Sequence, residues 1–162
     1  MKKIISVVLL IFVLAFSFTS CFDSSSSNDD QGTGNAGGGS SKSNLGDYNV
    51  VIDSCRIAED YEGKPIVIVK YVFTNNGDEA ASFMWSLNTS VFQDGIGLNE
   101  CYVADDSANY SSDNQSKEIK SGASLSVEVA YELNDSVTDI EVEVSEYLSW
   151  SDKKVTKTFK IK

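Results

Sequence analysis

Short apolar runs with a period of two residues dominate the sequence from about residue 45 to the C-terminus, and they constrain the fold most strongly. The clearest run spans residues 124–133, where an apolar side chain occupies every second position. Successive side chains of a strand point to opposite faces of a sheet, so this run predicts a strand with one buried face. No window offers several helical turns of apolar residues at a 3.6-residue period, so an all-β fold is expected.

Further strands are predicted at residues 48–57, 66–73, 81–92, 138–146 and 155–161. The segment 66–73 is apolar almost throughout, which is typical of a central strand. Asp94-Gly95 follows the strand at 81–92, and an Asp-Gly pair favours a tight hairpin. About seven short strands in one domain, residues 45–162, predict an immunoglobulin-like antiparallel β-sandwich.

The N-terminus has the layout of an export signal. Two lysines follow Met1, and the next fifteen residues, 4–18, are apolar except for Ser6 and Ser17. A permanent membrane helix, the alternative, needs roughly 20 apolar residues to cross a hydrocarbon core about 30 Å thick. Residues 1–20 are therefore expected to be a signal peptide.

The signal ends in Phe18-Thr19-Ser20-Cys21, which resembles the lipobox of bacterial lipoproteins. The resemblance implies that Cys21 becomes the N-terminus and carries a diacylglyceryl group. Two acyl chains hold a protein stably in a membrane, whereas one chain alone anchors it only marginally. The expected location is therefore the extracellular face of the cell membrane.

Residues 21–44 predict a lipidated cysteine followed by a disordered linker. Ser, Gly, Asn and Asp dominate this segment, which lacks the apolar surface needed for a core. A Gly/Ser coil of this length has an end-to-end distance of roughly 25 Å. The linker would therefore hold the domain close to the lipid surface.

Charge and residue usage exclude several function classes. The formal net charge is −11 and the chain has no histidine, which disfavours nucleic-acid binding and excludes imidazole-based catalysis. Adjacent acids do not supply two carboxylates facing each other across a cleft, and no Ser-x-x-Lys spacing occurs. We therefore expect no enzyme activity and no cofactor.

Cys55 and Cys101 are the cysteines that remain beside Cys21. An exported protein can keep a disulfide, and a bond between them would stabilise the fold by about 4 kcal/mol in the chain-entropy model. Two separate buried thiols are the alternative.

Two features offer candidate binding residues. Up-and-down strands would bring the turn 75–80 and the loop 105–116 to one end of the sandwich, where acidic residues could form a weak calcium site or bind a cationic partner. The alternative is a set of solvated acids that keep the domain soluble. These residues are Asp78, Glu79, Asp105, Asp106 and Asp113.

Trp150 lies at a predicted hairpin tip, where it would either stack on a sugar or partner protein or fold back onto the sheet. Trp85 has the same parity as Phe83 and Leu87, which predicts a core position.

Four segments together resemble a bacterial lipoprotein family known as domain of unknown function 5067. They are Tyr71–Glu79, Val91–Leu98 with Phe-Gln-Asp-Gly as its most specific part, Ile119–Ala123 and Ala130–Asp135. The resemblance implies a telokin-like, immunoglobulin-type sandwich over about residues 48–162 and brings no catalytic residues.

These observations favour a lipid-anchored, non-enzymatic interaction module with an extracellular protein partner. A small-ligand or cation-binding module, for calcium or sugar, is the alternative.

Overall fold

The structure is a computed structural model that describes residues 43–103 and 109–161. These residues belong to one compact unit, Gly37–Lys162. The signal peptide, Cys21, nearly all of the predicted linker, and Asp105 and Asp106 lie outside the described residues. The elements are β1 (Ser43–Leu45), β2 (Tyr48–Glu59), β3 (Pro65–Asn75), α1 (Phe83–Ser86), β4 (Leu87–Gln93), β5 (Ile96–Gly97), β6 (Ser124–Glu132), β7 (Ile140–Glu146) and β8 (Lys154–Phe159).

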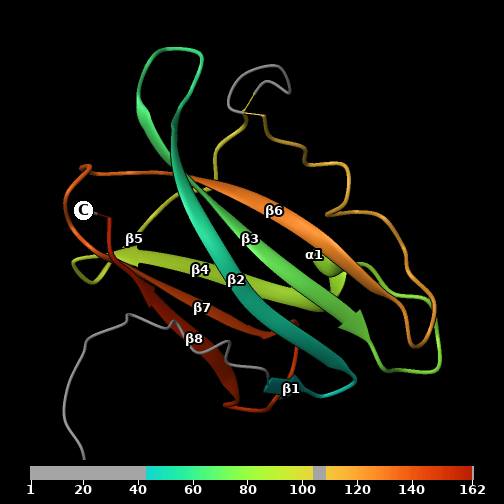
Figure 1. Cartoon of the computed structure of the whole chain (residues 1–162). Coiled ribbons are helices and arrows are strands. Elements are labelled where there is room, and N and C mark those ends of the chain that lie inside the picture. Colours follow the sequence, from blue (N-terminus) through green and yellow to red (C-terminus); the bar gives the residue numbers. More distant parts are fainter. Residues whose placement is uncertain (1–42, 104–108, 162) are drawn as a thin grey trace, which may run out of the picture. The chain divides into compact units, whose positions relative to one another are not determined.

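Two four-stranded antiparallel sheets face each other, which confirms the predicted all-β sandwich (Figure 1). The first sheet has the order β1-β2-β3-β6, and the second has the order β5-β4-β7-β8. β3 is a central strand, as its sequence predicted. The β4–β5 hairpin turns at Asp94 and Gly95, which have φ angles of 51° and 74°, the positive values that a tight hairpin requires.

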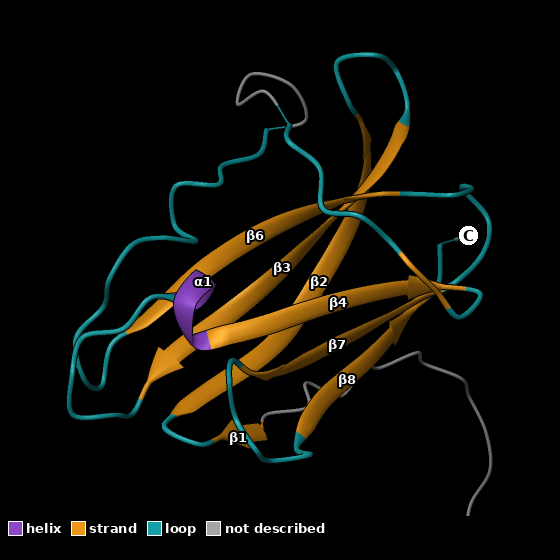
Figure 2. Cartoon of the chain, turned by 180° about the vertical axis from the view of Figure 1, so that it is seen from behind, coloured by secondary structure: helices purple, strands orange, loops and turns teal. Residues whose placement is uncertain are grey.

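The sequence missed two local features. β1 begins at Ser43, inside the segment expected to be linker. The predicted strand 81–92 begins instead with the helical turn α1, and β4 starts only at Leu87 (Figure 2). On a helical turn residues four apart share a face, so Phe83 and Leu87 are both buried while Trp85 points away from the core. The prediction that Trp85 is a core aromatic was therefore wrong.

The inner faces of both sheets form the main core. Alternate residues of β3 and β6 meet those of β4 and β7, and an aromatic cluster links the two sheets. In that cluster the ring centroid of Phe83 lies 5.2 Å from that of Tyr71 and 5.9 Å from that of Phe73. α1 thus anchors the start of β4 against β3 through Phe83.

The outer face of the first sheet carries a second, smaller core. Ile66 and Ile68 of β3 and Ala130 of β6 are fully buried there beneath Val103 and Tyr110. The connection between β5 and β6 therefore crosses and covers this face.

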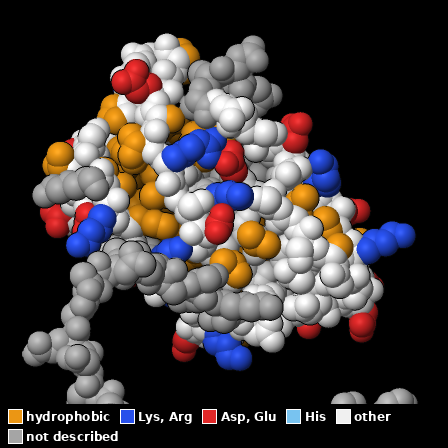
Figure 3. Space-filling model, in the orientation of Figure 1, with side chains coloured by type: hydrophobic (Ala, Val, Ile, Leu, Met, Phe, Trp, Pro, Cys, Tyr) orange, Lys and Arg blue, Asp and Glu red, His pale blue; other side chains and the backbone are white. Residues whose placement is uncertain are grey.

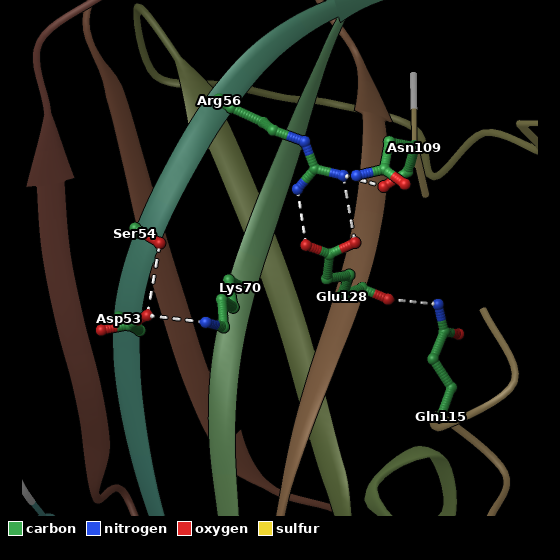
Figure 4. Close-up of polar contacts among 7 residues, drawn as sticks. All are labelled: Asp53, Ser54, Arg56, Lys70, Asn109, Gln115 and Glu128. Atoms are coloured by element: carbon green, nitrogen blue, oxygen red, sulfur yellow. Dashed lines mark hydrogen bonds and ion pairs between the residues drawn. The ribbon is translucent and has the colours of Figure 1, made fainter. Parts of the chain in front are cut away.

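A charged pair on the same face holds the connection in place (Figure 4). Arg56 contacts Glu128 in a bidentate pair, with Nη1–Oε1 at 2.5 Å and Nη2–Oε2 at 3.1 Å. The same guanidinium donates to the backbone carbonyl of Asn109 at 2.9 Å, and the Gln115 amide donates to that of Glu128 at 2.7 Å. Charge-assisted bonds with this geometry are the stronger kind, so they fix the covering segment to β2 and β6.

Lys157 joins the two sheets at their other edge. Its ammonium donates to the backbone carbonyls of Ile52 at 2.9 Å and Asp53 at 2.7 Å. The register of β2 against β3 shifts between Ile52 and Ser54. Lys157 on β8 therefore binds carbonyls at the irregularity of β2 and closes this side of the sandwich.

Gln93, the glutamine of the Phe-Gln-Asp-Gly motif, is buried and ties β4 to the connection between β6 and β7. Its amide nitrogen donates to the carbonyls of Asp135 and Thr138 at 3.0 and 2.9 Å, and its oxygen accepts from the Asn134 N–H at 2.9 Å. The Asp135 carboxylate accepts from the backbone N–H groups of Val137 and Thr138, which lowers its pKa. The Asp135 carboxylate therefore stabilises the fold at pH values above its pKa in the unfolded chain. This contribution is lost as the pH falls through the lower pKa of the folded state.

We predict that Gln93→Met lowers the free energy of unfolding by about 2 kcal/mol, because several backbone groups lose a buried partner. Urea denaturation measures the change. Asn88→Met on the same strand is the matched control, since Asn88 is exposed and exposed substitutions usually stay within about 0.5 kcal/mol. An equal loss in both variants would show that the Gln93 bonds contribute nothing specific.

Candidate functional site

The candidate site lies where β6, at one edge of the first sheet, approaches β4 of the second. β5 pairs with β4 only at Phe92 and Gln93, and Leu98 N–H adds one bond to the Val91 carbonyl at 2.8 Å. Across residues 43–103 and 109–161, no strand pairs with the outer side of β4 from Leu87 to Ser90. That stretch is an open strand edge.

Two adjoining hollows follow this edge, and we call them together the edge groove. The first, of about 210 Å³, is lined by the start of β4, α1 and Tyr147; the second, of about 220 Å³, is lined by Cys101, Tyr102, Tyr110 and Ser112. Both hollows are also lined by Glu100, Gln115 and Val129. Among its described lining residues, the groove therefore combines aromatic walls with one carboxylate near its middle.

Backbone pairing positions Glu100. It forms an isolated antiparallel bridge with Tyr131 of β6, and the neighbouring Cys101 N–H donates to the Ala130 carbonyl at 3.0 Å. The Glu132 N–H donates to the Asn99 carbonyl at 2.9 Å. Residues 99–101 thus run along β6 as a short added edge, which turns the Glu100 side chain to the groove.

A polar chain leads from Glu100 into the core between the sheets. The Thr89 hydroxyl lies 3.5 Å from Glu100 Oε1 and accepts from the buried Tyr131 hydroxyl at 2.8 Å. Burial raises the pKa of Tyr131 to about 12, and the Glu100 charge adds to the effect. Within the described part of the chain Glu100 forms none of the ion pairs, so the groove keeps a negative charge that a cationic group could neutralise.

The Cys101 thiol of the groove is not activated as a nucleophile. Burial, reinforced by Glu132, Asp60 and Glu100, raises the pKa of the Cys101 thiol to about 11. Only the thiolate is a nucleophile or metal ligand, and almost none is present near neutral pH. The arrangement is suited to binding through an open strand edge, aromatic walls and a carboxylate.

Comparison with known proteins settles the family. The sequence family described as domain of unknown function 5067 matches residues 23–146, which is most of the chain. The chain belongs to this family. The match begins earlier than the expected residue 48 and ends at Glu146, so the β7–β8 connection and β8 fall outside it.

One solved structure has a similar fold, described as "Structure of a putative lipoprotein from Staphylococcus aureus subsp. aureus NCTC 8325". The TM-score is 0.56 at 20% sequence identity, over 75% of this chain and 93% of that one. Among curated proteins, none matches this chain. No helix in the described residues of this family member is long and apolar enough to cross a membrane.

Three of the five residues of the predicted acidic site, Asp78, Glu79 and Asp113, belong to the described part of the chain, and the structure does not bring Asp113 to the other two. Asp78 and Glu79 are exposed beyond the end of β3, and with Asp47 they border a hollow of about 360 Å³. Asp113 is exposed in the connection that leads to β6, and it does not line that hollow. Among the residues that the structure describes, no three Asp, Glu or Cys side chains meet in a way that could hold a metal ion.

Trp150 is fully exposed, with a relative accessibility of 102%, so of its two predicted placements the structure has the exposed one.

Sequence reasoning missed Glu100, Tyr102 and Tyr147. The signal for Glu100 was weak, because it depends on the course of the chain after the β4–β5 hairpin and not on a local pattern. Figure 3 shows a further exposed apolar area beside the β2–β3 hairpin, where Ile57 and Pro65 help to line a hollow of about 490 Å³.

Cys55 and Cys101 are free thiols in the structure, as in the second predicted alternative, but each is only partly buried. Cys55 packs against the main core and Cys101 against the outer core. The two side chains therefore lie on opposite faces of the first sheet, a position from which no bond can form without unfolding.

We predict that a chain carrying Cys21→Ala shows two reactive thiols under denaturing conditions without reductant. In the folded chain with Cys55 also replaced by Ala, alkylation of Cys101 should be slow at pH 8 and should quicken about tenfold per pH unit up to about 11, because only the thiolate reacts. Ellman titration and timed alkylation followed by mass spectrometry make the two measurements. Thiols that appear only after reduction would contradict the placement on opposite faces.

Proposed function

We propose that this chain is a lipid-anchored lipoprotein of the extracellular membrane face, and that its sandwich is a non-enzymatic interaction module. Support for the anchor comes from the lipobox-like Phe18–Cys21 and from the similarity of the fold to the structure described as that of "a putative lipoprotein". The proposal assigns no catalytic step and no cofactor.

The observation that carries the interaction role is the open edge of β4 beside Glu100. An unpaired strand edge invites an extended segment of another chain, whose backbone can continue the sheet. In the edge groove such a segment would lie over Asn88 and Thr89, and aromatic walls would contact its side chains. A Lys or Arg of the segment would meet the Glu100 carboxylate.

The partner is therefore an extended, basic segment of an extracellular protein. A charge-assisted bond between its cation and Glu100 gives both orientation and specificity. The alternative is a calcium- or sugar-binding module. Its calcium form is less favoured because, among the described acidic residues, Asp113 does not line the hollow that Asp78 and Glu79 border.

We predict that labelled fatty acid enters the full chain in the bacterial host and that Cys21→Ala abolishes the incorporation. Cys101→Ala is the matched control and should keep the label, because Cys101 is a partly buried thiol of the folded domain. Gel autoradiography and intact-mass measurement report the result. Label retained by the Cys21 variant would remove the anchor.

We predict that a photo-crosslinking amino acid at Asn88 captures a discrete extracellular protein on intact cells, whereas the same group at Tyr61, in the distant β2–β3 hairpin, does not. Glu100→Lys should lower the yield about tenfold, the effect of losing roughly 1.4 kcal/mol of binding. Glu79→Lys makes the same charge change at an exposed site outside the edge groove and should leave the yield unchanged. Equal yields in the two lysine variants would overturn the role of the groove.

A further inference from the structure

Large apolar side chains are exposed together at one end of the sandwich. Trp85 is 71% exposed, Tyr147 48%, Leu148 84% and Trp150 102%; we call these four the aromatic tip. The Tyr147 N–H donates to the Ser86 carbonyl at 2.9 Å, which joins α1 to the β7–β8 connection. The tip is thus built from two chain segments that are remote in sequence.

The local chemistry of the tip is unusual for this acidic chain. Residues 147–151 read Tyr-Leu-Ser-Trp-Ser and carry no charge, in a protein of net charge −11. Leu148 has a φ angle of 54°, a left-handed conformation that non-glycine residues other than Asn and Asp adopt uncommonly. The connection therefore turns tightly and leaves Leu148 and Trp150 in water, where clustered apolar surface marks an interaction site.

The chain leading from the proposed anchor reaches the domain at this same end. Ser43 begins β1, and the turn after β1 abuts the end of β7: a Cβ atom on Gly46 would lie 2.5 Å from Glu146 Oε1. Glu146 directly precedes Tyr147 of the tip. Figures 1 and 2 agree in placing β1 beside the β7–β8 connection, with the β2–β3 hairpin at the far end of the long strands.

We propose that the aromatic tip inserts into the interfacial layer of the membrane that carries the anchor. The proposal rests on the lipid anchor of the proposed function. Trp and Tyr concentrate at membrane interfaces because their rings are apolar at one end and polar at the other. A flexible coil of the residues between Cys21 and Ser43 would hold Ser43 at a root-mean-square distance of roughly 25 Å from the anchored cysteine. The tip would then be at a high effective concentration near the lipid, so even a weak intrinsic affinity gives a high occupancy.

Charge around the tip determines which lipids suit it. Asp47, Glu146 and Asp152 lie close by in sequence or in contact. Of the two nearby cations, Lys153 follows Asp152 directly, and Lys154 pairs with Glu143 at 2.7 Å. Four acids around two lysines leave no net positive charge to attract anionic headgroups, so insertion is driven by the apolar rings and Leu148. A rising share of anionic lipid should weaken insertion at low salt, and added salt should restore it.

The test uses the fact that the chain has two tryptophans, both in the aromatic tip. Purified lipidated full-length protein is reconstituted into phosphatidylcholine vesicles, with and without lipids brominated near the headgroup. We expect Trp emission to move to shorter wavelength and to lose about half its intensity with brominated lipid, as for rings at the interface. Leu148→Ser together with Trp150→Ser should reduce the wavelength shift while the protein still floats with the vesicles.

A relocated reporter provides the control. Trp85→Phe, Trp150→Phe and Tyr61→Trp together move the single tryptophan to an exposed site in the β2–β3 hairpin, where brominated lipid should not quench it. Protein that floats but shows water-like, unquenched emission from the native tryptophans would overturn the tip proposal alone. Protein that fails to float with the vesicles would overturn the lipid anchor, and with it the proposal that the tip lies at the membrane. A shift that grows with protein density but is insensitive to brominated lipid would assign the tip to a second copy instead.

Discussion

Burial of β3 on both faces is the constraint on which the rest of this structure depends. Residues from Ile66 to Val69 are completely inaccessible, although they alternate between the two sides of the sheet. One side meets the second sheet, but the other needs a cover that no sheet supplies. The β5–β6 connection provides it by bringing Val103 and Tyr110 over Ile66 and Ile68. Since this cover must run past β6, it also brings Glu100 to the groove beside β4.

Local pattern was enough to predict most strands, because each has at least one buried face and a period of two. It failed where the chain leaves that period. Phe83 and Leu87 are four residues apart, and this spacing fits a strand and a helical turn equally well, so the position of Trp85 depended on which conformation formed. β1 has three residues and a polar composition, and only its pairing with β2 identifies it. Glu100 and the placement of the two cysteines on opposite faces follow from topology, which spacing in sequence does not encode.

The edge groove and the aromatic tip are neighbours that share Tyr147, yet they present different chemistry. The groove has a carboxylate, an open backbone edge and partly buried aromatic walls. The tip has rings that are exposed, and residues 147–151 carry no charge. The groove is therefore suited to a ligand that makes a directional polar contact. The tip is suited to the interfacial layer of a membrane, whose lipids hold no fixed positions. Their adjacency would place a peptide bound at β4 close to the lipid headgroups.

The short pairing of β1 with β2 has a mechanical consequence. Tension on an anchored chain would reach the sandwich through Ser43. In the described part of the chain β1 pairs with β2 at three positions, from Ser43–Val50 to Leu45–Tyr48. So short a ladder can peel away stepwise while the long β2–β3 ladder stays intact. Releasing β1 and its turn would lengthen the linker between the anchor and the sandwich by roughly 15 Å, at about 3.3 Å per residue. It would also remove one residue, Leu45, from the core. Among the described elements, β1 is therefore the one that tension on an anchored chain would release first.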